Sequence, residues 1–180
     1  MAAFNMDFGI LVTRGAVWLA LTLYVAGEFF SAFPSARNKF AVYWWLNVAG
    51  CIFFLAHVVC AFEYFYGWSH SFAYADTARQ TKELTGWDSG SGLYVNYLFA
   101  LVWLSEVIWW RKSATTYFSR RPLWTWTVRV FFLFMICNGA FIFVRSHLRW
   151  YGLTLSVLLA ISWLLRLKRN IDAQPAPKSS

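Results

Sequence analysis

Residues 40–66 read FAVYWWLNVAGCIFFLAHVVCAFEYFY, an apolar run that holds one acidic residue, Glu63, and no lysine, arginine or proline. A helix needs about 20 mostly apolar residues to cross the hydrocarbon layer of a bilayer. The apolar residues form one long run here, whereas a soluble core is built from short alternations of apolar and polar residues. The stretch therefore predicts a transmembrane helix, and with it an all-α membrane fold.

Four further apolar runs of similar kind lie at residues 10–33, 93–110, 123–144 and 150–167. Together with residues 40–66, they predict an all-α, polytopic integral membrane protein built as a bundle of five transmembrane helices. Residues 1–168 would form this single domain. No internal repeat divides it.

Two segments are expected to lie outside the lipid. Residues 69–84 predict one short extramembrane helix, with Ser69 as its N-cap and Gly86 just after its end. Its expected apolar face is modest and is formed by Phe72, Tyr74, Ala75 and Ala78. Residues 169–180 hold prolines, serines and little apolar surface, so we expect a disordered cytoplasmic tail.

Composition agrees with a lipid environment. The 180 residues are 59% hydrophobic and 13% charged, whereas soluble domains carry about 25% charged residues. The net charge of +8 could indicate nucleic-acid binding, but the basic residues stand at the ends of the apolar runs. A nucleic-acid-binding protein would gather them on one soluble face, so we expect the lipid bilayer as partner and no nucleic acid.

The basic residues also predict an orientation. With the N-terminus outside, ten Lys and Arg residues fall on the inner side of the five spans and five on the outer side. Cytoplasmic loops carry the excess of positive charge. We therefore expect a multi-pass protein of a bacterial inner membrane, with the N-terminus outside and the C-terminus in the cytoplasm.

One histidine lies deep in an expected span. An unpaired polar group in hydrocarbon costs several kcal/mol, so His57 needs a partner or a purpose. At the same expected depth lies Met135, and a His57/Met135 pair could hold haem. Cys60 or Cys137 could instead contribute to a copper site. The alternative is a core histidine bonded to a backbone carbonyl or to a Tyr or Asn side chain across the bundle, with buried thiols that act as small hydrophobes.

A second set of polar residues lies toward the expected inner side. Glu106 and Arg129 sit in the inner third of neighbouring antiparallel spans, which predicts an ion pair. Glu28 and Asn47 lie at a similar depth and could join them. This layer is interpreted either as a stabilising network or as a half-channel for protons or a small ion.

A third set lies at the expected outer side. Glu63, Tyr66, His70 and His147 would form a polar, aromatic outer vestibule. Aromatic pockets with a few polar groups suit a substrate, a quinone head-group or a partner protein. The alternative is a solvated surface without a ligand.

Residues 57–96 carry a resemblance. With Trp68-Ser69-His70, Thr77-Ala78 and Gly90-Ser91-Gly92-Leu93-Tyr94-Val95-Asn96-Tyr97, this stretch resembles uncharacterised small polytopic membrane proteins of bacteria. The resemblance implies no particular activity.

The chain also has no P-loop, GxSxG, CxxCH or HExxH motif, which argues against ATP hydrolysis, serine hydrolysis and covalent haem attachment.

Three functions are consistent with these patterns. The first is a non-catalytic subunit or accessory component of a larger membrane protein assembly, with other membrane subunits as partners. The second is a membrane redox protein that binds haem, copper or quinone near His57. The third is a small channel or carrier that uses the Glu106/Arg129 layer.

Overall fold

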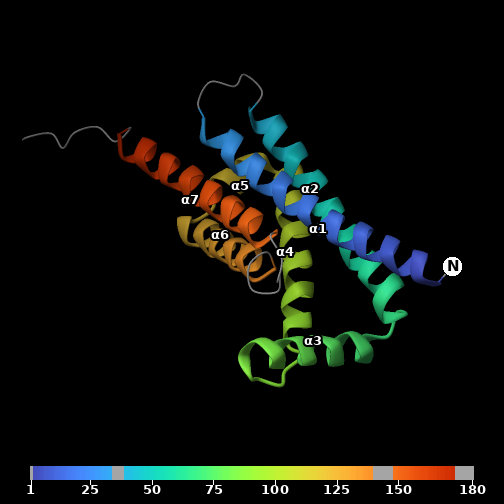
Figure 1. Cartoon of the computed structure of the whole chain (residues 1–180). Coiled ribbons are helices and arrows are strands. Elements are labelled where there is room, and N and C mark those ends of the chain that lie inside the picture. The colour runs from blue at the N-terminus through green and yellow to red at the C-terminus, as the bar shows by residue number, and fades with distance from the viewer. Residues whose placement is uncertain (1, 34–38, 140–147, 173–180) are drawn as a thin grey trace, which may run out of the picture.

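The computed structural model describes residues 2–33, 39–139 and 148–172 (Figure 1). The described residues form helices and hold no strand, which confirms the all-α prediction. The elements, in chain order, are α1 (Ala2–Ala32), α2 (Lys39–Ala61), the π-helix η1 (Phe62–Tyr66), α3 (His70–Thr85), α4 (Gly92–Lys112), α5 (Ala114–Phe118), α6 (Pro122–Cys137) and α7 (Leu148–Asp172).

Four helices are long and apolar enough to cross a membrane, as in a multi-pass membrane protein. They are Met6–Ala32 in α1, Phe40–Tyr66 in α2 with η1, Gly92–Lys112 in α4, and Arg149–Arg169 in α7. The second coincides with the predicted span, and the spans predicted at residues 93–110 and 150–167 match α4 and α7 within a few residues. The first helix begins earlier than predicted, because residues 2–9 continue α1.

The span predicted at residues 123–144 corresponds to α6, which is shorter. The α-helix Pro122–Cys137 has 16 residues, and residues 140–144 lie outside the described part of the chain. Pro122 opens α6 at a position where its missing N–H is tolerated.

The predicted disordered tail starts at residue 169, and its first four residues are helical. Helix α7 continues to Asp172, and residues 173–180 lie outside the described residues. Lysine and arginine are good helix formers and are favourable in the last turn of a helix. Arg169 also donates a hydrogen bond of 2.9 Å to the carbonyl oxygen of Ala32, which fixes the end of α7 against the end of α1.

The long helices form one bundle, in which α1 lies along α2 and α7 runs beside α1 (Figure 1). We name as the basic end the end where α1, α4 and α7 finish and α2 and α6 begin, marked by Lys112, Arg120, Arg121 and Arg169. Helix α3 lies across the other end of α4 (Figure 1).

Small residues allow α1 and α2 to approach closely. A Cβ atom on Gly27 would meet the Tyr43 ring at 3.0 Å, and one on Gly50 would meet the carbonyl oxygen of Ala20 at 3.1 Å. Small residues at helix interfaces let backbones come close in membranes, where packing drives association. Close packing at these small residues therefore holds α1 and α2 together.

The middle of the bundle is an aromatic core. Trp103 is fully buried, and its ring lies 5.3 Å from Phe132 and 5.6 Å from Tyr24. Phe99 packs on Phe132 at 4.7 Å. Rings at these separations interact favourably beyond the area they bury, so α1, α4 and α6 meet in one solid layer.

Helix α3 has the predicted caps but a different packed face. The Ser69 hydroxyl accepts a hydrogen bond from the Phe72 N–H, and Gly86 ends the helix with φ of 81°, a left-handed conformation that favours glycine. Its packed side holds Ala73 and Thr77; of the predicted apolar face, Phe72 is exposed, and the Tyr74 ring lies 6.0 Å from Tyr94 of α4. The prediction grouped residues by polarity, but small side chains let α3 approach α4.

Candidate functional site: a polar cavity at the basic end

Glu28 is a buried carboxylate with three donors around it. It is 2% exposed and accepts hydrogen bonds from the Tyr43 hydroxyl and from the Trp163 indole at 3.0 Å. Arg166 of α7 completes the set, with Nη2 at 2.9 Å from Oε2. A buried charge is tolerated when it is paired and its remaining lone pairs are bonded, and these contacts tie α2 and α7 to α1.

Arg166 also serves the end of α1. Its guanidinium donates to the carbonyl oxygen of Glu28 at 2.7 Å and to the Ser31 hydroxyl. Basic side chains near the C-terminal end of a helix can bond its carbonyls and interact favourably with the helix dipole. Arg166 is therefore both counter-ion and cap.

Glu106 forms a second buried ion pair, with Arg120. The guanidinium Nη1 lies 2.6 Å from Oε1 and 2.7 Å from Oε2 of Glu106, and Nε donates to the Thr125 hydroxyl at 3.0 Å. The Tyr117 hydroxyl donates to Glu106 at 2.8 Å. Burial raises the pKa of Tyr117 well above its ordinary value, and the charge of Glu106 raises it further, so Tyr117 acts as a neutral donor.

The short helix α5 makes this second pair possible. The Tyr117 ring stacks on Trp110 at 5.3 Å with an interplanar angle of 11°. Arg120 follows α5, and its guanidinium lies 4.3 Å above the Tyr117 ring, a cation–π contact. The turn after α4 thereby directs Arg120 back toward Glu106.

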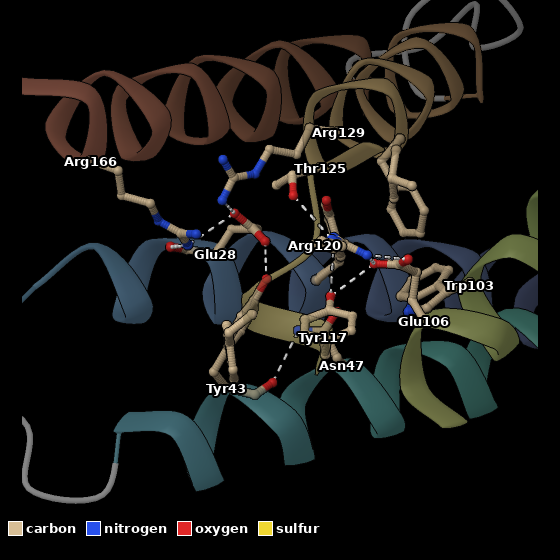
Figure 2. A pocket seen from close by; sticks show the side chains of 14 residues that line it. Glu28, Tyr43, Asn47, Trp103, Glu106, Tyr117, Arg120, Thr125, Arg129 and Arg166 are labelled. Atoms are coloured by element: carbon tan, nitrogen blue, oxygen red, sulfur yellow. Dashed lines mark hydrogen bonds and ion pairs between the residues drawn. The ribbon is translucent and has the colours of Figure 1, made fainter. Parts of the chain in front are cut away.

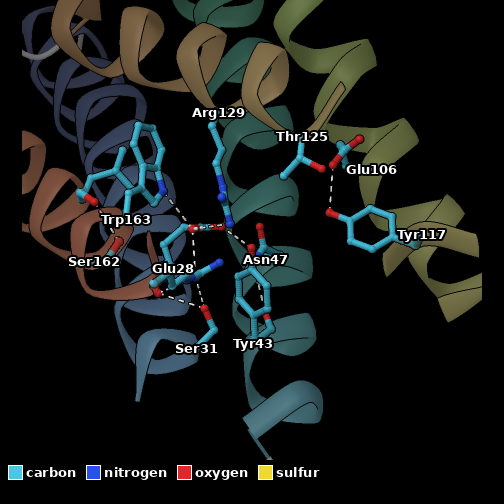
Figure 3. A network of polar contacts seen from close by, with 12 residues as sticks. Glu28, Ser31, Tyr43, Asn47, Glu106, Tyr117, Thr125, Arg129, Ser162 and Trp163 are labelled. Carbon is cyan, nitrogen blue, oxygen red and sulfur yellow. Dashed lines mark hydrogen bonds and ion pairs between the residues drawn. The ribbon is translucent and has the colours of Figure 1, made fainter. Parts of the chain in front are cut away.

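Arg129 is the third arginine of this region and reaches from α6 toward Glu28 (Figure 3). Its Nη2 lies 3.9 Å from Glu28 Oε2, which is too long for a hydrogen bond. The guanidinium also lies 5.4 Å from the Trp126 ring and 5.9 Å from the Trp163 ring. Arg129 is thus held by aromatic contacts and by a loose ion pair.

A cavity of about 160 Å³ lies between the two glutamates (Figure 2). We call it the polar cavity. Its walls come from α1, α2, α4, α5, α6, α7 and the α5–α6 connection, through Tyr24, Glu28, Tyr43, Asn47, Trp103, Glu106, Tyr117, Phe118, Arg120, Thr125, Val128, Arg129, Phe132 and Arg166. Toward the middle of the bundle, the buried rings of Tyr24, Trp103 and Phe132 close it.

The predicted inner layer is gathered here, but its predicted ion pair is wrong. Glu28, Asn47, Glu106 and Arg129 all line the polar cavity. Glu106 pairs with Arg120 and Arg129 faces Glu28, in place of the expected Glu106/Arg129 pair. The depth of a residue along its helix does not reveal that Arg120, in the α5–α6 connection, pairs with Glu106.

Sequence reasoning missed three contributors to the cavity. Tyr43, Trp163 and Arg166 were not among the predicted site residues, although they are the partners of Glu28. A signal did exist for Arg166, which lies within the apolar run 150–167, one residue before its end. An arginine inside a span is expected to have a partner.

His57 is hydrogen-bonded to a backbone carbonyl. Its Nδ1 donates a hydrogen bond of 2.8 Å to the carbonyl oxygen of Thr13 on α1, and Met135 packs in the aromatic core.

Cys60 is half-buried, and the Cys137 sulfur lies 3.7 Å from the Ser156 hydroxyl. Within the described residues, no group of three or more His, Cys, Asp or Glu side chains could hold a metal. The haem and copper hypotheses stay predictions.

The described residues of the predicted outer vestibule each have a partner. Glu63 accepts a hydrogen bond of 2.7 Å from the Trp68 indole, and Tyr66 donates to Asp76 at 3.2 Å. His70 packs against the rings of Tyr94 and Tyr97, at 5.7 and 5.9 Å. His147 lies outside the described residues. A vestibule ligand stays a prediction.

Comparison with protein-family models, with curated proteins and with solved structures finds no match to this chain. The polar cavity is therefore interpreted from its own geometry.

Proposed function

We propose that this protein is a small membrane carrier or half-channel, and that a small polar solute occupies the polar cavity. The observation that carries the proposal is the lining itself. Three arginines and two glutamates from separate elements surround one cavity of about 160 Å³ in a bundle of apolar helices. Ionisable residues within membrane helices are costly and typically mark the pathway of a solute or ion.

The shape of the cavity supports access from one side. The fully buried Trp103 and its neighbours Tyr24 and Phe132 separate it from the other half of the bundle. A carrier exposes its site to one side at a time, and this arrangement corresponds to the state that opens toward the basic end.

We propose five crossings for the bundle, with α6 as the fourth. Thr125 near the start of α6 lies beside Arg120 at the basic end, and Phe132, two turns later, packs in the aromatic core. Helix α7 then runs parallel to α1, since Arg166 and Arg169 reach the C-terminal end of α1. A return crossing by α6 would connect the end of α4 to the start of α7. The positive-inside rule places the basic end in the cytoplasm and the N-terminus outside.

The carrier is preferred to the accessory subunit because five ionisable side chains line the polar cavity, and ionisable residues inside membrane helices typically mark a solute or ion pathway. Both the subunit role and the redox role near His57 stay predictions. The bacterial inner membrane is the proposed location.

Flux into liposomes tests the proposal. Purified protein would be reconstituted, and stopped-flow light scattering would follow swelling in isosmotic potassium salts, sodium salts and small polyols, with valinomycin to balance charge. At least one solute should enter faster than in protein-free liposomes. Asn47→Leu, which removes a polar wall of the cavity, should slow that solute by about tenfold, as expected for a loss of about 1.4 kcal/mol.

Asn96→Leu is the matched control, because Asn96 lies on an exposed face of α4 and does not line the cavity. It should keep the wild-type rate. Swelling rates equal to those of protein-free liposomes for every solute would refute the carrier.

A further inference from the structure

We infer that the polar cavity binds a small oxyanion, a carboxylate or a phosphate, through the Arg129 guanidinium and the Trp103 indole N–H. The inference rests on the proposed function, because it names the class of the solute that occupies the cavity. It can be tested separately, since binding is measured without a membrane.

The ionisable side chains of the lining carry one net positive charge. Glu28 is matched by Arg166 at 2.9 Å, and Glu106 is matched by Arg120 at 2.6 Å. Arg129 is the third arginine, and its closest carboxylate oxygen, at 3.9 Å, is already ion-paired with Arg166 and accepts a hydrogen bond from Trp163. Three arginines against two glutamates favour an occupant with one negative charge.

The hydrogen-bond donors point the same way. Trp103 is fully buried and lines the cavity, and its Nε1 has no hydrogen-bond partner among the described residues. The Arg129 guanidinium makes no hydrogen bond within the same part of the chain, although its side chain is 17% exposed. Buried donors in folded proteins are nearly always satisfied, so an acceptor from outside the chain would complete this site.

The acceptors of the lining are already taken. This applies to the charged acceptors and to Thr125: Glu28 accepts from Tyr43 and Trp163, Glu106 accepts from Tyr117 and Arg120, and the Thr125 hydroxyl accepts from Arg120. The side-chain carbonyl of Asn47 and the Tyr24 hydroxyl are neutral. A cation would therefore meet donors and excess positive charge, and a neutral solute would leave Arg129 uncompensated. Carboxylates and phosphates suit this lining, because the planar guanidinium binds their oxygens in pairs.

The volume limits the size of the occupant. A dry cavity of about 150 Å³ in another protein holds one benzene molecule, and the polar cavity measures about 160 Å³. It therefore suits inorganic phosphate, a carboxylate of a few carbon atoms, or the headgroup alone of an anionic lipid.

The test measures binding to the full-length protein in a neutral detergent. The melting temperature would be followed against inorganic phosphate, acetate, and phosphatidylglycerol in mixed micelles, each with potassium chloride at matched ionic strength as reference. We expect at least one probe to raise the melting temperature saturably above its chloride reference. Arg129→Gln should weaken that binding by about tenfold or more, because it removes the charged donor, and Arg129→Lys should weaken it less.

Arg79→Gln is the charge-matched control, since Arg79 is exposed on α3, and it should bind like the wild type. The probe that binds identifies the source of the oxyanion as phosphate, carboxylate or lipid headgroup. No saturable shift with any of the three, or equal affinity in Arg129→Gln, would overturn the inference. If Arg129→Gln does not fold, the same melting measurement on the wild type with tetramethylammonium chloride tests the inference. Saturable binding of this cation, without binding of the anions, would also overturn the inference.

The two proposals fail separately. Binding of an oxyanion without flux would leave the anion site intact and remove the carrier. Flux of a neutral or cationic solute without oxyanion binding would keep the carrier and remove the anion site.

Discussion

At the scale of single residues, the two buried glutamates divide the arginines between them. Glu106 is paired with Arg120 in a bidentate contact, and both side chains are largely buried, at 16% and 9% exposure. Arg129 has only the 3.9 Å contact with Glu28. The first contact is a structural element of the bundle, whereas the second leaves a guanidinium available to a ligand.

This difference predicts unequal effects on stability. Glu106→Gln leaves the Arg120 charge buried without its counter-ion, and such a loss costs about 3–5 kcal/mol. The melting temperature and the yield of monodisperse protein should both fall. Arg129→Gln removes no hydrogen bond within the described chain, so its melting temperature should stay close to the wild type in the absence of ligand. Equal melting temperatures for Glu106→Gln and the wild type would contradict the structural role of the pair.

At the scale of elements, helix pairs are positioned by small residues and by side chains that reach across. A Cβ atom on Gly50 of α2 would lie 2.8 Å from Cζ2 of Trp103 on α4. Gly50 therefore provides the space in which the Trp103 indole lies against the polar cavity. Arg166 and Arg169 act in a similar way for α7, because they bind the carbonyls of Glu28 and Ala32 near the end of α1.

Gly50→Ala tests this packing. The added methyl group must displace the Trp103 ring or separate α2 from α1, and overpacking of this kind costs about 1–3 kcal/mol. Thermal unfolding in one detergent should show the loss. Gly15→Ala is the control, because a Cβ at Gly15 meets no atom within 4 Å and alanine is the better helix former by about 0.5–1 kcal/mol. A melting temperature that rises in both variants would refute the close approach at Gly50.

At the scale of the whole molecule, the number of crossings decides which compartment the polar cavity faces. Five crossings place the termini on opposite sides, and the cavity then lies near the cytoplasmic face with the basic end. Four crossings would place both termini on one side.

Reporter fusions distinguish these topologies. Alkaline phosphatase inserted after Asp88, between α3 and α4, should be active because this loop is expected outside. The same enzyme fused after Ser180 should be inactive, and a green fluorescent protein at that position should fluoresce. An N-terminal tag should be reached by an external protease in intact cells. Termini found on the same side would contradict the five-crossing topology.

The apolar runs and the caps of α3 could be predicted because they depend on local chemistry. Residues 40–66 have to form a helix in hydrocarbon, where the backbone can bond only to itself. Ser69 and Gly86 mark helix ends by their own side-chain and backbone preferences. The gathering of Glu28, Asn47, Glu106 and Arg129 was also accessible, since depth follows from position along each span.

The partners within the cavity depend on how the helices rotate and where the loops turn. By itself, the sequence determined an all-helical fold, four helices long and apolar enough to cross a membrane, and the level of the polar layer, because these follow from the solvent that each residue requires. Only the tertiary structure decided that Arg120 pairs with Glu106 and that Arg166 pairs with Glu28. It also decided that Arg129 and Trp103 remain without a hydrogen-bond acceptor among the described residues. Those outcomes depend on contacts of a few ångströms between segments far apart in the chain, and hydropathy carries no information about them.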